Sequence, residues 1–85
     1  MRLLFMGTPR FAAVSLKALI NAGFELGGVV TQPDRPQGRG MQLQPSAVKL
    51  AALEDELRLY QPVKLASTEF LTEFNQLSPD LVVVV

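Results

Sequence analysis

The sequence predicts an α/β fold, the first half of a doubly wound, Rossmann-like parallel sheet. Short apolar segments alternate along the chain with segments of helical periodicity, which is typical of parallel strands joined by right-handed crossovers. The last segment, residues 81–85, is entirely apolar, as expected for a central parallel strand covered on both faces. With the strands numbered along the chain, the expected order in the sheet is 3-2-1-4, and ligands are expected at the carboxyl ends of strands 1 and 4.

The expected elements alternate between strand and helix. Strands are expected at residues 3–6, 25–31, 59–61 and 81–85. Helices are expected at residues 9–22, 47–57 and about 68–77. In the first helix, Thr8 offers an N-cap hydroxyl, Pro9 suits the first helical position, and Gly23 can end the helix in a left-handed conformation.

Ser46 can cap the second helix, and either Ser67 or Thr68 can cap the third, where Glu69 suits the positive end of the helix dipole. In the second strand, Gly27 and Gly28 indicate either a close backbone approach or room for a neighbouring helix.

Helical spacing predicts which side chains face the core. In the first helix they are Phe11, Val14 or Ser15, Ala18, Leu19 and Ala22. In the second helix they are Leu50, Leu53 and Leu57. In the third helix they are Phe70, Leu71, Phe74 and Leu77.

Residues 31–49 are expected to form a long shaped loop, through which neither helix nor strand can run. The segment contains three prolines and two glycines, Pro33, Pro36, Pro45, Gly38 and Gly40. Proline removes a backbone donor and glycine tolerates a positive φ. The segment also carries Arg35 and Arg39. Because loops of this length are uncommon in compact domains unless they are functional or disordered, we expect a recognition loop for an anionic partner.

The distribution of charge agrees with that expectation. The 85-residue chain has a net charge of zero. Residues 1–49 hold six basic side chains against two acidic ones, whereas residues 50–85 hold two basic against six acidic. The basic half contains the loop, and such asymmetry favours an anionic partner.

The composition excludes several kinds of chemistry. The chain has no cysteine and no histidine, so disulfides, thiolate nucleophiles, imidazole bases and nearly all zinc or copper sites are excluded within it. No apolar run approaches the length that crosses a membrane. We therefore expect a soluble, cytoplasmic protein that does not contact a membrane and holds no metal.

No catalytic constellation is visible. The turn at residues 7–9 lacks the second and third glycines of the dinucleotide fingerprint. The consecutive acids at 54–56 point in different directions on a helix, and Glu69 and Glu73 form an ordinary solvated face. Tyr60 is expected to pack at a sheet edge.

Five segments stand in a characteristic order and spacing. They are FMGTPxF at 5–11, VTQPDRPxGRG at 30–40, PSxVK at 45–49, QP at 61–62 and PDLVVV at 79–84. Together they closely resemble the amino-terminal part of the methionyl-tRNA formyltransferase family. The resemblance covers essentially all 85 residues, and the segment at 30–40 is its most specific part.

The resemblance implies that residues 1–85 are the amino-terminal portion of a formyltransferase-type domain, ending after its fourth strand. The rest of the catalytic domain and a carboxy-terminal domain would follow. The implied reaction transfers a formyl group from the co-substrate 10-formyltetrahydrofolate to the amino group of methionyl initiator tRNA, in translation initiation. The family's catalytic Asn, His and Asp and its folate-holding segment lie beyond the position of Val85. Accordingly, no catalytic or folate-binding residue is expected in this chain, which alone would be inactive.

The resemblance also implies a tRNA-binding site. In the family, the segment matching residues 32–45 recognises the acceptor stem. By that match Arg39 would reach into the groove near the terminal pair, while Arg35 and Lys49 would contact phosphate or support the loop. Two family lysines are replaced by Met41 and Gln42, which makes the loop less basic. In addition, Arg10 stands where the family commonly has aspartate.

Two alternatives remain open. One is a formyltransferase that acts on an amino sugar nucleotide and has no need of the arginine-bearing loop. The other is a non-catalytic half-Rossmann binding module, for which the 85 residues would have to be a complete protein. Against the second, the uncharged strand at 81–85 predicts that the isolated chain is partly unfolded or aggregates. The complete enzyme is expected to be a monomer.

Overall fold

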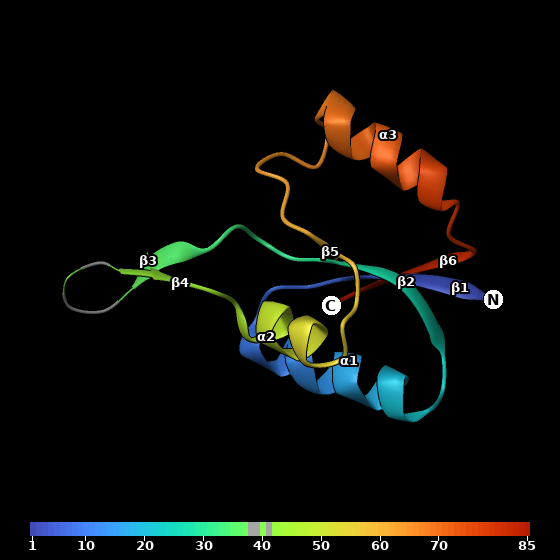
Figure 1. Ribbon diagram of the computed structural model, residues 1–85, viewed down its shortest axis with the longest axis horizontal. Helices are drawn as coiled ribbons and strands as arrows, with labels where there is room; N and C mark the ends of the chain where they lie inside the picture. The colour runs from blue at the N-terminus through green and yellow to red at the C-terminus, as the bar shows by residue number, and fades with distance from the viewer. Residues whose placement is uncertain (38–39, 41) are drawn as a thin grey trace.

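A computed structural model describes residues 1–37, 40 and 42–85 and has a parallel sheet with helices on both faces (Figure 1). The strands of the main sheet are β1 (Arg2–Met6), β2 (Glu25–Val30), β5 (Leu59–Tyr60) and β6 (Leu81–Val84). The helices are α1 (Arg10–Asn21), α2 (Ala47–Glu54) and α3 (Thr68–Leu77). A separate two-stranded sheet consists of β3 (Arg35–Gln37) and β4 (Gln42–Gln44).

The main sheet has the order β5-β2-β1-β6 with parallel pairing throughout its described strands. This confirms the predicted α/β class, and it reproduces the predicted order 3-2-1-4. In Figure 1, α1 and α2 lie on one side of the sheet and α3 lies on the other. The chain thus forms half of a Rossmann-like arrangement.

Alternation along the strands divides the core into two layers. Phe5 and Val29 pack with the buried residues of α1 and α2. Their neighbours Leu4 and Val30 pack with Phe70, Leu77 and other residues on the α3 side. Because successive strand residues point to opposite faces, one apolar run serves both layers.

The two glycines of β2 are explained by close approach to neighbouring side chains. Residue pairing between β1 and β2 shifts by one position at Gly27, between Leu3 and Leu4 of β1. A Cβ atom at Gly28 would lie 2.7 Å from Cε2 of Tyr60. The sheet therefore leaves no room for a side chain at this point.

The predicted caps agree with the structure at three of four helix ends. Ser46 and Ser67 each accept a hydrogen bond from the backbone three residues on, at 3.0 and 3.3 Å. Gly23 has a φ of 85° and ends α1. The predicted Thr8 cap is wrong: the N-cap residue is Pro9, and no side chain caps α1. The Thr8 hydroxyl instead accepts a hydrogen bond from the backbone N–H of Gln32 at 3.1 Å.

The predicted inward faces of α1 and α2 are correct only in part: Leu19 and Leu57 are partly buried against the core as predicted, whereas the fully buried side chains of both helices are others. In α1, Ala12 and Leu16 are buried, whereas Phe11 and Val14 are exposed. The buried residues of α2 are Val48, Ala51 and Ala52. The leucines predicted to face inward, Leu50 and Leu53, are each about half exposed. In α3, Phe70 and Leu77 are buried as predicted, whereas Leu71 is about half exposed.

The prediction that residues 31–49 contain no strand is also wrong. β3 and β4 pair antiparallel, with Arg35 opposite Gln44 and Pro36 opposite Leu43. Proline is tolerated in such a ribbon where the ladder does not need its N–H. The described part of the segment, residues 32–37, 40 and 42–45, is therefore a hairpin that projects from one end of the sheet (Figure 1). The sequence span 32–45 is called the hairpin arm below.

The strand at the carboxyl end is partly exposed, as expected for the isolated 85 residues. Within the described part of the chain, β6 pairs with β1 alone. Leu81 is 50% exposed and Val84 72%, whereas Val82 and Val83 pack against the two core layers. No helix of the described residues has both the length and the hydrophobicity needed to cross a membrane.

Candidate functional site

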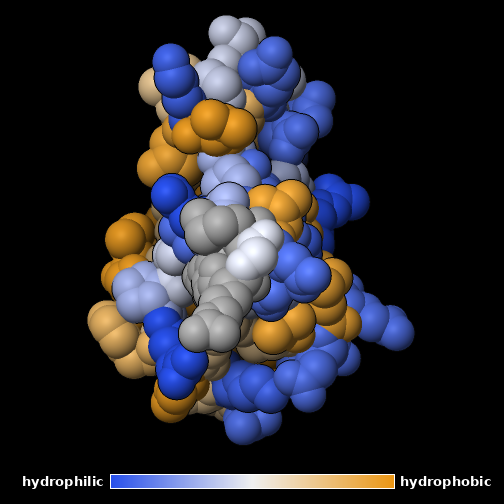
Figure 2. Space-filling model, turned by 90° about the vertical axis from the view of Figure 1, so that its left-hand side faces the viewer, coloured by the Kyte–Doolittle hydropathy of each residue, from blue (hydrophilic) through white to orange (hydrophobic). Residues whose placement is uncertain are grey.

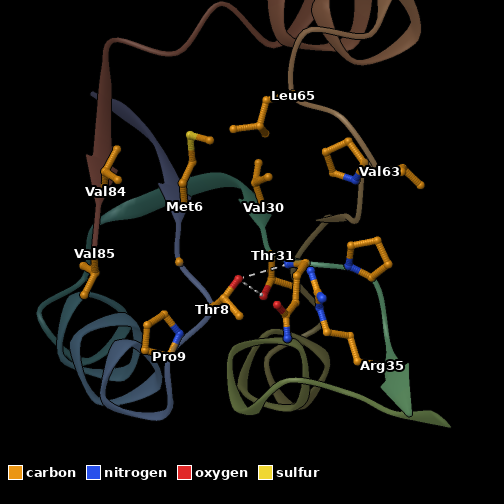
Figure 3. Close-up of a pocket in the computed structure, with 14 residues that line it drawn as sticks. Met6, Thr8, Pro9, Val30, Thr31, Arg35, Val63, Leu65, Val84 and Val85 are labelled. Carbon is orange, nitrogen blue, oxygen red and sulfur yellow. Dashed lines mark hydrogen bonds between the residues drawn. The ribbon is translucent and has the colours of Figure 1, made fainter.

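An open pocket of about 320 Å³ lies at the carboxyl ends of β1, β2 and β6, beside the base of the hairpin arm (Figure 3). Its lining consists of Met6, Gly7, Thr8, Pro9, Val30, Thr31, Gln32, Pro33, Arg35, Pro62, Val63, Leu65, Val84 and Val85. This is the edge at which parallel α/β sheets hold their ligands, and the edge expected from the sequence.

The two sides of the pocket differ in chemistry. In Figure 3, apolar side chains including Met6, Val30, Leu65 and Val84 lie toward one side. Thr8, Thr31 and Arg35 lie toward the other, nearer the hairpin arm. The pocket is therefore suited to a ligand with an apolar part and a polar or anionic part.

Three hydroxyl groups connect the pocket to α2. The Thr31 Oγ1 atom lies 3.3 Å from the Oγ1 of Thr8 and 2.8 Å from the Oγ of Ser46. Thr31 and Ser46 are both buried. Since these two residues stand just before and just after the hairpin arm, their side-chain contact closes its base.

A second polar cluster holds the first residues of the arm. The Lys49 ammonium on α2 donates to both carboxylate oxygens of Asp34, at 3.1 Å each. The side-chain amide of Gln61, which follows β5, donates to Asp34 at 2.9 Å and to the carbonyl of Gln32 at 3.1 Å. These hydrogen bonds, first from Gln61 and then from Lys49, lower the pKa of Asp34 below its ordinary 3.8.

The predicted tRNA-binding residues lie in different surroundings. Arg35 is exposed on β3 and lines the rim of the pocket. Lys49 lies in the polar cluster with Asp34, and its side chain is only 21% exposed. Arg39, the residue with the most specific predicted role, lies outside the residues that the structure describes. Figure 2 views the molecule from the hairpin end, where hydrophilic and hydrophobic residues alternate over the visible surface.

Sequence reasoning did not single out Asp34, Gln61 or the Thr31–Ser46 contact. A signal was available, because Asp34, Ser46 and Gln61 all lie within the motif segments at 30–40, 45–49 and 61–62. Their mutual contacts depend on the sheet order, which brings the end of β5 beside the end of β2.

The described residues contain no group of three or more His, Cys, Asp or Glu side chains arranged to hold a metal ion. The polar groups of the site are hydroxyls, amides, one carboxylate and basic side chains. Such groups can bind and orient a polar or anionic ligand.

The sheet topology defines this chain as part of a Rossmann-like α/β domain, with a pocket at the carboxyl edge of its sheet. No protein-family model matches it. It is, however, similar to proteins named methionyl-tRNA formyltransferase. Identity is 52% over 84 residues with the protein of Marinobacter nauticus, covering 99% of this chain and 27% of that relative.

A relative of the same name from Symbiobacterium thermophilum is 53% identical over 85 residues, covering 100% of this chain and 26% of the relative. A third relative of this name, from Moorella thermoacetica, is also 53% identical over 85 residues, covering 100% of this chain and 27% of the relative. Over essentially its whole length, the chain is therefore similar to part of the proteins of that name. It spans about a quarter of the length of the curated relatives it matches.

Proposed function

We propose that this chain is the amino-terminal portion, residues 1–85, of an enzyme that transfers a formyl group from 10-formyltetrahydrofolate to methionyl initiator tRNA. Similarity along the whole chain to proteins of that name carries the proposal. It favours this activity over transfer to an amino sugar nucleotide and over a non-catalytic binding module. As a step of translation initiation, the reaction would be cytoplasmic, with a monomeric enzyme.

The role proposed for this portion is to receive the tRNA. The hairpin arm projects beside a pocket at the carboxyl edge of the sheet, so an acceptor stem held by the arm would bring its aminoacyl end to that edge. The catalytic and folate-binding groups would be supplied by residues beyond Val85. This chain would contribute binding and orientation, which can account for a large part of a rate enhancement.

Within the arm, we assign different roles to the two arginines. Arg39 would contact a base edge near the end of the acceptor stem, where a bidentate contact is worth about 1–3 kcal/mol. Arg35 is exposed on β3 and would neutralise a phosphate. A contact of that kind strengthens binding whatever the base sequence and makes the affinity fall as the salt concentration rises.

The test compares Arg39→Ala with Arg58→Ala in the complete enzyme. Arg58 is exposed and directly precedes β5, at the opposite edge of the sheet. We expect Arg39→Ala to lower kcat/KM for charged initiator tRNA by about tenfold or more, mainly through KM. Arg58→Ala should leave it near the wild-type value. An unchanged kcat/KM in Arg39→Ala would refute the assignment, and a wild-type enzyme that fails to formylate methionyl-tRNA would refute the function.

A further inference from the structure

We infer that Asp34, Lys49 and Gln61 form a clamp that positions the hairpin arm, and that Lys49 acts on tRNA binding through Asp34 rather than by its own phosphate contact. The inference rests on the proposed function, and it assigns Lys49 one of two roles that the sequence leaves open. The three residues are positioning residues.

The clamp joins three separate elements at one carboxylate. Asp34 directly precedes β3, Lys49 lies in the first turn of α2, and Gln61 follows β5. Both Asp34 oxygens accept from Lys49, and one of them also accepts from Gln61. Since α2 packs against the sheet and β5 is paired with β2 within it, these contacts hold the start of β3 relative to the pocket.

The clamp determines the direction in which the arm projects, because the Thr31–Ser46 contact already holds the base of the arm together. The Thr31 and Ser46 hydroxyls lie 2.8 Å apart and are buried, which fixes where the arm leaves the sheet. A hairpin held only at its base can still pivot, and a second attachment prevents this. The carboxylate of Asp34, three residues beyond Thr31, provides that second attachment.

The surroundings of Lys49 argue against a direct phosphate contact. Its charge is compensated by a carboxylate at 3.1 Å, and the exposed fractions of the two side chains are 21% and 30%. A phosphate approaching Lys49 would also approach Asp34, whose charge repels it. Arg35 differs: among the described acidic groups, none lies within ion-pair distance of it.

The two roles of Lys49 predict different salt dependence. A residue that neutralises one phosphate contributes about one unit to the slope of log K against log salt concentration. A positioning residue changes affinity and leaves the slope as it is. The variants Asp34→Asn and Lys49→Met therefore separate the two, with Arg35→Ala as the reference for a phosphate contact.

The first experiment measures KM and kcat of the complete enzyme for charged initiator tRNA over a series of salt concentrations. We expect Asp34→Asn and Lys49→Met each to raise KM by about fivefold to tenfold, with kcat nearly unchanged and a wild-type slope. The double variant should be no worse than either single one, because both remove the same contact. Lys49→Arg, which can still pair with Asp34, should restore most of the affinity.

Glu54→Gln is the matched control. It removes an exposed ion pair of α2, with Lys17 at 2.7 Å, and should leave KM unchanged. If Lys49→Met lowers the slope by about one while Asp34→Asn changes neither KM nor slope, Lys49 contacts phosphate and the inference is wrong.

The second experiment needs no tRNA and so separates the clamp from the proposed function. It measures backbone hydrogen exchange at residues 32–37 and 42–44 in the free enzyme. Both clamp variants should accelerate exchange there, and Glu54→Gln should not. Unchanged exchange in both variants would overturn the clamp even if the enzyme formylates methionyl-tRNA. Faster exchange in a protein that lacks that activity would leave the clamp standing and refute only the proposed function.

Discussion

Replacing Gly28 by alanine tests how tightly β2 packs against its neighbours. A Cβ atom at this position would lie 2.7 Å from Cε2 of Tyr60 and 3.2 Å from Cδ1 of Leu4. The Tyr60 ring cannot move freely, because it packs edge-on against Phe70 with ring centroids 6.3 Å apart, and Phe70 is buried. Accommodating the methyl group therefore requires the α3 side of the core to shift.

The expected cost follows from two opposing effects. Overpacking a well-packed core costs about 1–3 kcal/mol. Alanine also reduces the conformational entropy of the unfolded chain, which offsets about 0.4–1 kcal/mol. We expect Gly28→Ala to lower the free energy of unfolding by about 1–2 kcal/mol.

Gly27→Ala is the matched control because it adds the same methyl group at the preceding residue. There the Cβ atom would lie 2.7 Å from Cγ and Cδ of Arg2, and the Arg2 side chain is 46% exposed. This partly exposed side chain can move away at the loss of a surface ion pair with Glu25, which is worth little, and of its hydrogen bond to the Leu77 carbonyl. The lower conformational entropy of the unfolded alanine variant offsets the lost hydrogen bond. The expected change is within about 0.5 kcal/mol.

The assay is urea unfolding of the complete enzyme, as wild type and as each variant, followed by circular dichroism. The reasoning holds if Gly28→Ala shifts the midpoint to lower urea while Gly27→Ala leaves it nearly in place. Equal effects in the two variants would refute it, since they would show that the Tyr60 ring yields as easily as the Arg2 chain.

Three further predictions concern the caps, the clamp and the isolated chain. Ser46→Ala should cost about 1–2 kcal/mol, more than Ser67→Ala, because Ser46 both caps α2 and contacts buried Thr31; equal costs in urea unfolding would contradict this. The pKa of Asp34 is lowered, so the stability that its charge confers is complete above pH 3.8 and is lost as pH falls through the lower folded pKa. The unfolding free energies of wild type and Asp34→Asn should therefore differ by a constant amount at higher pH and converge below 3.8; a gap that persists there would contradict the assignment. Finally, the isolated 85-residue chain should aggregate or melt without cooperativity through its exposed strand at 81–85, and a monodisperse chain with a sharp thermal transition would contradict that.

The sheet could be predicted from the sequence because its signal is local and redundant. Residues 3–6 and 81–85 are apolar without interruption, and a run of that kind has few stable places outside a buried parallel sheet. Once strands and helices alternate, the handedness of the crossovers leaves few possible orders. The order then determines that the base of residues 32–45 lies beside the pocket.

The helix faces could not be predicted in the same way, because α2 carries two apolar stripes. Its sequence, AVKLAALE, is apolar on nearly all sides. Periodicity does not distinguish the stripe of Leu50 and Leu53 from that of Val48, Ala51 and Ala52. The distance between α2 and its neighbours determines which stripe is buried, since a close approach to α1 and the sheet admits only the smaller side chains.

The hairpin was missed for a related reason. Pro36 would interrupt a central strand, and from sequence alone the segment gives no sign that it pairs only with itself. In a two-stranded ribbon Pro36 needs to meet only Leu43. The predicted function of the segment does not depend on this difference, because an arm that projects from the pocket is as suitable for an anionic partner as a loop.

The charge asymmetry of the sequence overstates the positive charge available to that partner. Of the basic residues in the first half, Arg2, Lys17 and Lys49 each lie within ion-pair distance of an acid. Much of the excess positive charge is therefore compensated by acidic side chains within the chain. Among the described residues of the arm, Arg35 is the cation without such a partner, and it lies at the pocket rim. A count of charges indicates only the half of the chain that carries the basic excess, whereas the contacts distinguish a cation that can meet a phosphate from one that is paired with a carboxylate.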